Sequence, residues 1–182
     1  LILGNFEVFS VFKRKISIIF LDLILVISLL SILHLRNDTI SSYVLLIWII
    51  ILTISSDIGG YTFGKIFKWK KLTKLSPNKT LSGVLGSFIF SIGSVFMLNF
   101  IFNILSGTDT DFFIKGRYFI LAIFLSAAAQ LGDLTVSYFK RLEGIKDTGK
   151  LLPGHGGIFD RVDSLMFVII AGIALYHFGI FP

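Results

Sequence analysis

Aspartates stand at the edges of long apolar segments, where a carboxylate is costly to keep. Asp57, Asp133 and Asp163 each adjoin such a segment, and Asp22 lies inside another. An aspartate at the centre of a membrane-spanning helix costs about 2.5–3.5 kcal/mol, so each one calls for a functional reason. The sequence contains no Cys, which leaves carboxylates, carbonyls and histidines as metal ligands. Oxygen ligands favour hard cations such as Mg²⁺, so the aspartates are candidate ligands for one.

Polar side chains recur along one side of the segment that begins at Asp133. Ser137, Lys140 and Arg141 lie four, seven and eight residues after it, and at 3.6 residues per turn these positions share one helical face. The opposite face is apolar, so the polar face is expected to line a cavity. The structural alternative is a salt-bridged helix end whose cations reach the membrane surface.

A loop rich in glycine and charge follows this segment. Residues 146–164 read KDTGKLLPGHGGIFDRVDS. Glycines let a backbone approach a ligand closely, and Lys and Arg side chains neutralise phosphate oxygens. Asp160, Asp163 and Ser164 align on the first turns of the next apolar segment. Together these residue types predict a site for a metal ion and a polyphosphate.

A shorter polar segment lies near the middle of the chain. Ser76, Lys79 and Thr80 would present one cation and two hydroxyls to a phosphate, with Pro77 fixing a turn between them. A plain helix start explains the same residues. The segment is not a Walker loop, and no dinucleotide-binding glycine motif follows a strand.

Composition sets the class of fold that must position these residues. Of 182 residues, 54% are apolar and 15% are charged, and the mean hydropathy is +0.87. That balance excludes a soluble globule and a disordered chain. A spanning helix needs about 20 mostly apolar residues, and five segments approach that length: residues 16–35, 40–56, 81–105, 118–136 and 164–181. We therefore expect an all-α, polytopic membrane bundle of about five transmembrane helices, forming one domain over residues 1–182.

Two details of this bundle follow from the sequence. The second span ends in Asp57-Ile58-Gly59-Gly60, so we expect a broken or partly re-entrant helix there. Gly83, Gly86 and the small residues 126–129 permit close helix approach, within one subunit or between two, which leaves a homodimer as an alternative.

The basic residues predict the orientation of the chain. Fourteen of the 17 Lys and Arg residues precede the first span or lie in the loops after the second and fourth. Short loops rich in Lys and Arg remain cytoplasmic, so the N-terminus and these two loops are expected in the cytoplasm. Asp57, Asp133 and Asp163 then meet at one membrane depth on the cytoplasmic side. The run from Lys65 to Lys74 is also explained as a topology signal that touches anionic lipid.

The residues from Ser137 to Asp163 form a long ordered pattern, SxFKRx4KDxGx2LPxHGGIxDRVD. This pattern resembles the signature of the phosphatidate cytidylyltransferase family, also called CDP-diacylglycerol synthases. Ser56-Asp57 before a glycine-containing stretch from Tyr61 to Lys65, and the segment from Ser76 to Thr80, are similar to two weaker features of the family. The resemblance covers the chain from about residue 55 to its end, with the catalytic part at about 55–165. Relatives often carry an acidic residue where this chain has Ser82, and they are typically longer, so we expect N-terminal helices of relatives to be missing here.

The resemblance implies an Mg²⁺-dependent transfer of CMP from CTP to phosphatidate, giving CDP-diacylglycerol and pyrophosphate in phospholipid biosynthesis. It implies CTP, phosphatidate and the bilayer as partners, no nucleic acid, and a multi-pass protein of the inner cell membrane with its active site facing the cytoplasm. The residues and the resemblance together assign three groups. The catalytic residues are Asp133, Lys140, Arg141, His155 and Asp160; the metal ligands are Asp57, Asp133, Asp160 and Asp163; the substrate-binding residues are Ser76, Lys79, Thr80, Ser137, Lys146, Asp147, Gly156, Gly157 and Arg161.

Two other functions account for part of the pattern. Intramembrane aspartates also mark the ion pathway of a cation or proton transporter, although such carboxylates are expected nearer the midplane. A nucleotidyltransferase that acts on another lipid phosphate would keep the same fold and site.

Overall fold

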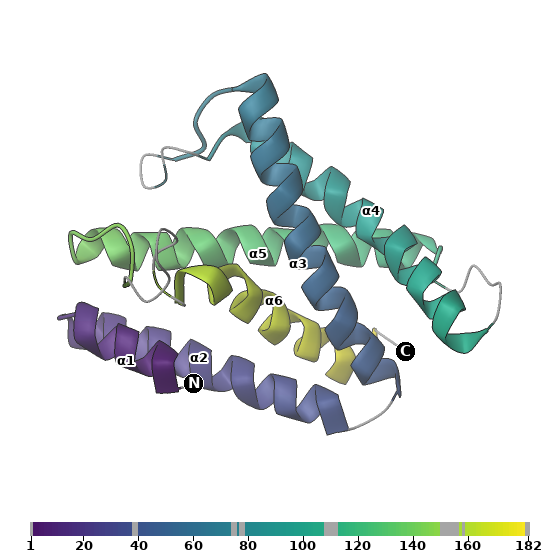
Figure 1. Cartoon of the computed structure of the whole chain (residues 1–182), viewed down its shortest axis with the longest axis horizontal. Coiled ribbons are helices and arrows are strands. Elements are labelled where there is room, and N and C mark those ends of the chain that lie inside the picture. The colour runs from purple at the N-terminus through teal and green to yellow at the C-terminus, as the bar shows by residue number, and fades with distance from the viewer. Residues whose placement is uncertain are drawn as a thin grey trace.

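The described residues of the chain form six helices (Figure 1). The structure is a computed structural model that describes residues 2–37, 40–73, 76, 79–107, 113–149, 157 and 159–180. Within these ranges there is no strand beyond an isolated bridge between Lys71 and Thr80. The predicted all-α fold is confirmed. The helices are α1 (Ile2–Val11), α2 (Lys15–Asn37), α3 (Ile40–Phe67), α4 (Leu81–Ser106), α5 (Gly116–Leu142) and α6 (Phe159–His177).

Four of the described helices are long and apolar enough to cross a membrane. The spans lie at Lys15–Arg36, Ser42–Phe67, Leu81–Ile104 and Gly116–Leu142, which correspond to the first four predicted segments. α6 differs because Asp160, Arg161 and Asp163 fall in its first two turns, and its apolar part begins only at Ser164. The count of about five spans therefore agrees with four long helices and the apolar remainder of α6, and the chain is a multi-pass membrane protein.

α3 corrects the expectation of a broken second span. The helix runs without interruption from Ile40 to Phe67 and passes straight through Asp57 and the two glycines after it. The glycines serve packing instead. A Cβ added to Gly60 would lie 2.7 Å from Ser87 Oγ, and one added to Gly83 would lie 2.9 Å from the Gly60 carbonyl oxygen. The backbones of α3 and α4 therefore approach within a distance that only glycine allows.

Gly86 is the point where this crossing tolerates least change. A Cβ there would lie 2.5 Å from Phe63 Cβ and would also meet the Gly59 carbonyl. We expect Gly86→Ala to lower the free energy of unfolding by about 1–3 kcal/mol, as overpacking does. Thermal unfolding in detergent measures this loss. The matched control is Gly93→Ala on the same helix, where a Cβ meets nothing within 4 Å, so equal melting temperatures for the two variants would contradict the packing assignment.

Buried hydroxyls join α3, α4 and α5 beneath this crossing. Ser87 Oγ donates to the Ser56 carbonyl at 2.8 Å, and the hydroxyls of Ser56 and Ser126 lie 2.9 Å apart. A further hydrogen bond joins α3 and α4 closer to the other end of the bundle: Trp48 Nε1 donates to Ser94 Oγ at 3.0 Å. Polar contacts of this kind hold helices together in a membrane, where apolar contact with a neighbouring helix and with lipid are nearly equivalent.

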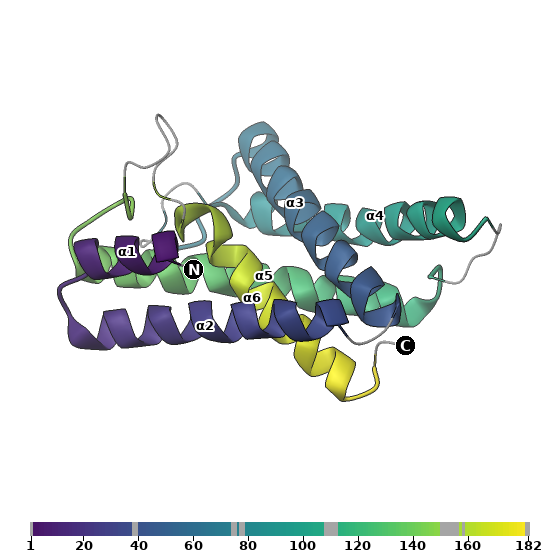
Figure 2. The ribbon, with the colours of Figure 1, turned by 60° about the horizontal axis from the view of Figure 1, so that its bottom comes forward.

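The remaining helices pack against α5 and against the N-terminal half of α3. α6 lies between α5 and α2, and the short α1 packs against α2 and α6 (Figures 1 and 2). One apolar cluster is centred on Trp48 and Tyr118, and a second contains Val8, Val136 and Phe159. The second cluster fixes α1 and the start of α6 against the end of α5 that carries the predicted polar face.

Candidate active site

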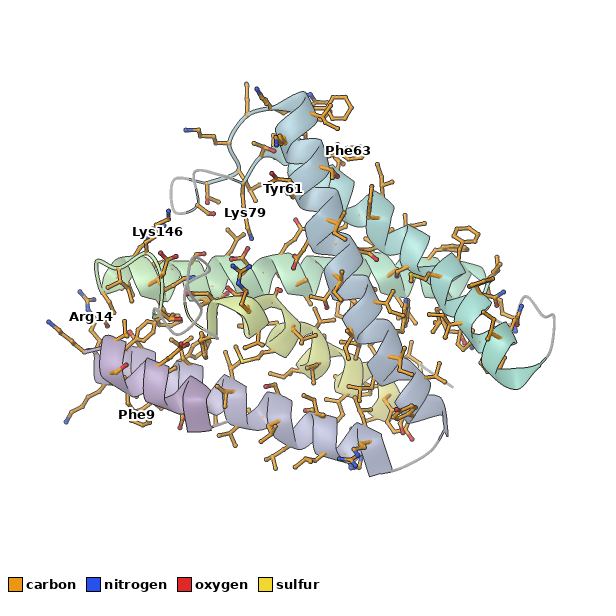
Figure 3. The ribbon with its side chains drawn as sticks, viewed as in Figure 1. Phe9, Arg14, Tyr61, Phe63, Lys79 and Lys146 are labelled. Atoms are coloured by element: carbon orange, nitrogen blue, oxygen red, sulfur yellow. The ribbon has the colours of Figure 1, made fainter. Side chains whose placement is uncertain are left out.

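A cavity of about 290 Å³ opens where α3, α4 and α5 meet the segment that precedes α4. Each element contributes polar groups to its wall. Figure 3 shows Lys79 extending toward α5, with Tyr61 beside it on α3. The lining residues are Asp57, Gly60 and Tyr61 of α3, Ser76, Lys79 and Thr80 before α4, Gly83, Val84 and Ser87 of α4, and Ala129, Gln130 and Asp133 of α5.

Local hydrogen bonds hold Lys79 and Thr80 at this wall. The Leu72 N–H donates to the Lys79 carbonyl at 2.8 Å, and the Leu81 N–H donates to the Lys70 carbonyl at 3.0 Å. Thr80 is the N-cap of α4, where its hydroxyl accepts the N–H of Gly83 at 3.1 Å. The predicted helix start is therefore real, and it coexists with a position on the cavity wall.

Asp133 is the centre of charge in the cavity. Its Oδ2 lies 2.5 Å from Lys79 Nζ, and its Oδ1 accepts a hydrogen bond from Ser137 Oγ at 3.3 Å. The charge of Asp133 also acts on Asp57 and on Asp163. Carboxylates on three helices thus repel one another, and Lys79 from the segment before α4 offsets part of that repulsion.

Asp160 lies beside this cluster in a separate buried pair. Its Oδ1 is 2.8 Å from Lys140 Nζ, with both side chains about nine-tenths buried. Its Oδ2 accepts the backbone N–H groups of Thr148 at 2.8 Å and Gly157 at 3.0 Å. Burial opposes ionisation, but the bonds from Lys140 and from these two N–H groups hold the pKa of Asp160 below its ordinary value. Both carboxylate oxygens are thus already occupied by protein donors.

Other predicted residues occupy the surface around the cavity and the pair. Lys146, Asp147 and Arg161 are exposed. Arg141 is exposed as well, and its Nη1 donates to the Ile145 carbonyl at 2.8 Å. These four side chains lie outside the lining of the cavity, so a direct role for them requires a substrate that extends beyond it.

The glycine-rich loop is described only at its two ends. His155 and Gly156 lie outside the described residues. Gly157 is buried, and its N–H donates to Asp160, so this donor is directed at a carboxylate and not into the cavity.

The carboxylates of the cavity fit a hard divalent cation. In the described part of the chain, no three His, Asp or Glu side chains form a ready metal cluster. Mg²⁺ does not require one, because it keeps several waters and is held by one or two carboxylates together with substrate phosphates. Asp57 and Asp133 line the cavity and meet that requirement, and Asp163 lies near Asp133. Asp160 is the poorest fit of the predicted ligands because its oxygens already accept three hydrogen bonds.

Several polar groups at or near the site were missing from the sequence prediction. Gln130 and Tyr61 line the cavity, and the buried Nε2 of Gln130 has no hydrogen-bond partner in the described structure. Glu7 is 2% exposed and reaches the loop before α6. Glu7 could have been predicted from the sequence, because it is a carboxylate within the apolar sequence of α1. The cost of a carboxylate among apolar residues is the argument that identified Asp22. Asp22 lies on α2, outside the cavity lining.

The fold and the site define a class: a polytopic membrane protein with a carboxylate and lysine cavity suited to a cation and phosphate groups. Residues 1–179 match the model of the cytidylyltransferase family, and the chain belongs to that family.

Curated relatives carry a more specific name. A phosphatidate cytidylyltransferase of Haemophilus influenzae is 41% identical over 134 residues, which cover 72% of this chain and 45% of the relative. One of Helicobacter pylori is 38% identical over 138 residues, covering 74% and 48%. One of Staphylococcus saprophyticus is 44% identical over 117 residues, covering 63% and 42%. The chain therefore spans about half the length of the curated relatives it matches.

Proposed function

We propose that the chain carries the catalytic core of a CTP:phosphatidate cytidylyltransferase, which forms CDP-diacylglycerol and pyrophosphate. The observation that carries this proposal is the cavity in which Asp133 meets Lys79 beside Asp57. Membership of the cytidylyltransferase family and the name shared by the relatives support it. Such a site matches a reaction between two phosphate-bearing substrates at a membrane.

The chemistry asks for positioning and charge neutralisation more than for a protein nucleophile. An oxygen of the phosphatidate phosphate attacks the α-phosphorus of CTP, the bond to the β-phosphate oxygen breaks, and pyrophosphate leaves. Both partners are anions, so the protein must hold them in line and offset their charge. When bound, Mg²⁺ supplies part of that neutralisation, and Asp57 and Asp133 are the residues that would hold it.

Lys79 has two alternative partners in this scheme. In the free protein its ammonium group pairs with Asp133. A phosphate group entering the cavity provides a second anionic partner within reach, next to the hydroxyls of Ser76 and Thr80. We infer that Lys79 turns from Asp133 to the phosphate when the substrates bind, which would leave Asp133 able to hold Mg²⁺.

The charged end of the bundle supports a cytoplasmic active site in the inner cell membrane. Lys65, Lys68, Lys70 and Lys71 are exposed and lie at or just beyond the end of α3 that borders the cavity. Clusters of Lys and Arg stay on the cytoplasmic side, where CTP is made. The acyl chains of phosphatidate would remain among the helices in the bilayer. A homodimer stays a prediction, and it would have to use a surface other than Gly83 and Gly86, which pack inside the chain.

Lys79→Met tests the binding role directly. The substitution removes the ammonium group and keeps most of the side-chain length, so we expect the KM for CTP or phosphatidate to rise on the order of tenfold or more, as for loss of a charged hydrogen bond. Steady-state kinetics at fixed Mg²⁺ measures the change. Lys115→Met at the opposite end of α5 is the control, and equal KM values for both variants and the unchanged protein would contradict the assignment.

The function itself is tested with radiolabelled CTP, Mg²⁺ and purified protein in lipid nanodiscs. We expect labelled lipid to appear when the nanodiscs contain phosphatidate. If label is transferred only to another lipid phosphate, the protein is a nucleotidyltransferase with that lipid, and not phosphatidate, as its substrate. Absence of transfer with every lipid, together with cation flux in liposomes, would favour a transporter.

A further inference from the structure

The carboxylate of Glu7 connects the first helix to the loop that precedes α6. Glu7 is 2% exposed. Its Oε2 accepts the backbone N–H of Phe159 at 2.9 Å and lies 3.5 Å from the Thr148 hydroxyl, which donates to it. Phe159 is the first residue of α6, so Glu7 satisfies one of the N–H groups that a helix N-terminus leaves without an intrahelical acceptor. Its negative charge also suits the positive end of the helix dipole.

Two glycines of the loop make room for this carboxylate. A Cβ added to Gly149 would lie 2.8 Å from Glu7 Oε1, and one added to Gly157 would lie 2.7 Å from Glu7 Oε2. Either contact is closer than a real Cβ tolerates. These glycines therefore face Glu7, which explains why small residues are needed here without invoking a ligand.

Glu7 and Asp160 both accept hydrogen bonds from the residues at the two ends of the loop between α5 and α6. Asp160 accepts the N–H groups of Thr148 and Gly157, while Glu7 accepts the Thr148 hydroxyl and the Phe159 N–H. Thr148 is fully buried and is shared by both carboxylates. The two ends of the loop are thereby fixed next to each other, and Asp160 is in turn paired with Lys140.

We propose that Glu7 is a positioning residue for the Lys140–Asp160 pair, a role that rests on the proposed function. Glu7 acts through Thr148 on Asp160 and through Asp160 on Lys140. Loss of the carboxylate frees both ends of the loop and loosens the Lys140–Asp160 pair. A substrate phosphate group that binds near Lys140 then meets a side chain that must first be ordered, and ordering costs affinity.

The test compares Glu7→Leu with a matched change at Glu143. Glu143 is also a carboxylate that accepts backbone N–H groups from a distant segment, those of Lys13 at 3.2 Å and Arg14 at 3.1 Å, beside the start of α2. Glu143→Leu therefore reports the cost of losing a long-range helix cap without removing any hydrogen bond of Thr148 or Phe159. Glu7→Gln is the conservative variant, because its amide oxygen can still accept one of the two hydrogen bonds.

Two readouts separate positioning from plain stability. Hydrogen exchange of the full chain in nanodiscs is expected to be at least about tenfold faster at Phe159 in Glu7→Leu, because its amide loses its acceptor. Exchange at Thr148, whose amide donates to Asp160, is expected to rise as well if its hydroxyl contact with Glu7 holds it in place, and exchange at both amides is expected to be unchanged in Glu143→Leu. The KM for CTP or for phosphatidate is expected to rise about tenfold in Glu7→Leu and to return toward normal in Glu7→Gln. Measuring both substrates identifies which phosphate group depends on the pair.

The proposal is overturned if Glu7→Leu leaves exchange at these amides unchanged, or if its KM values equal those of Glu143→Leu. Should Glu7→Leu fail to fold, Thr148→Val removes the hydroxyl contact from the loop side and is measured in the same way. An unchanged protein that transfers no cytidylyl group would overturn the proposed function. Exchange alone would then decide whether Glu7 holds the loop.

Discussion

Asp133→Asn is expected to lower kcat on the order of a thousandfold while leaving the protein folded and inserted. Asparagine keeps the shape of the side chain and an oxygen that can accept the Ser137 hydroxyl. It loses the charge that pairs with Lys79 and acts on Asp57 and Asp163. Removing one preorganised electrostatic group from an active site typically costs about 10²–10³ in kcat, and loss of the metal ligand that we propose at this position would add to that.

Asp22→Asn is the control for this result. Asp22 is also a carboxylate within a spanning helix, but it lies on α2 and outside the cavity lining. We expect near-normal kcat for Asp22→Asn in the cytidylyltransferase assay, with circular dichroism confirming the helical fold of both variants. Near-normal turnover in Asp133→Asn would remove Asp133 from the proposed mechanism.

Asp160→Ala is expected to destabilise the protein by about 3–5 kcal/mol, the usual cost of removing one partner of a buried ion pair. The substitution leaves the Lys140 ammonium, 8% exposed as a residue, without its carboxylate. It also leaves the N–H groups of Thr148 and Gly157 without their acceptor. Denaturant or thermal unfolding in detergent measures the loss. Exposed ion pairs contribute less than about 1 kcal/mol to stability. A loss of unfolding free energy below that value would therefore contradict the assignment of Lys140 and Asp160 as a buried pair.

The double variant Lys140→Met/Asp160→Leu separates charge from architecture. Apolar replacement of both partners of a buried pair is often neutral, so the part of the stability lost with the unpaired Lys140 charge is expected to return, and the part lost with the two N–H groups is not. Activity is expected to remain low, because the loop still lacks the acceptor for Thr148 and Gly157.

In the unchanged protein the pKa of Asp160 is lowered. Its stabilisation is therefore complete above the unfolded carboxyl value of about 3.9 and is lost as the pH falls below it.

Local periodicity predicted those parts of the site that lie on one helix. The spacing of Asp133 and Ser137 predicted a shared face, and the two side chains are hydrogen-bonded. The apolar lengths predicted the long helices for the same reason, since both depend only on residues near one another in the chain. Sequence periodicity could not predict the ion pair between Lys79 and Asp133, because this pair depends on how α3 and α4 cross α5.

Glycine was the residue type that sequence reasoning interpreted least well. Gly59 and Gly60 suggested a helix break, yet their neighbour is the backbone of α4. Gly157 suggested approach to a ligand, yet it faces Glu7 and Thr148. The absence of a side chain is equally useful for a turn, a ligand or a neighbouring helix, and only the packing partner distinguishes them. Glu7 itself escaped prediction because its acceptor role joins residues 152 positions apart.

The close crossing of α3 and α4 constrains how the protein can open. Two helices whose main chains touch at Gly59 and Gly86 cannot slide past or rotate about each other without collision, so they move as one rigid unit that carries Asp57. A displacement of this unit relative to α5 acts on the contact between α3 and α5, which includes the paired hydroxyls of Ser56 and Ser126. That buried hydrogen bond would have to break for the unit to separate from α5.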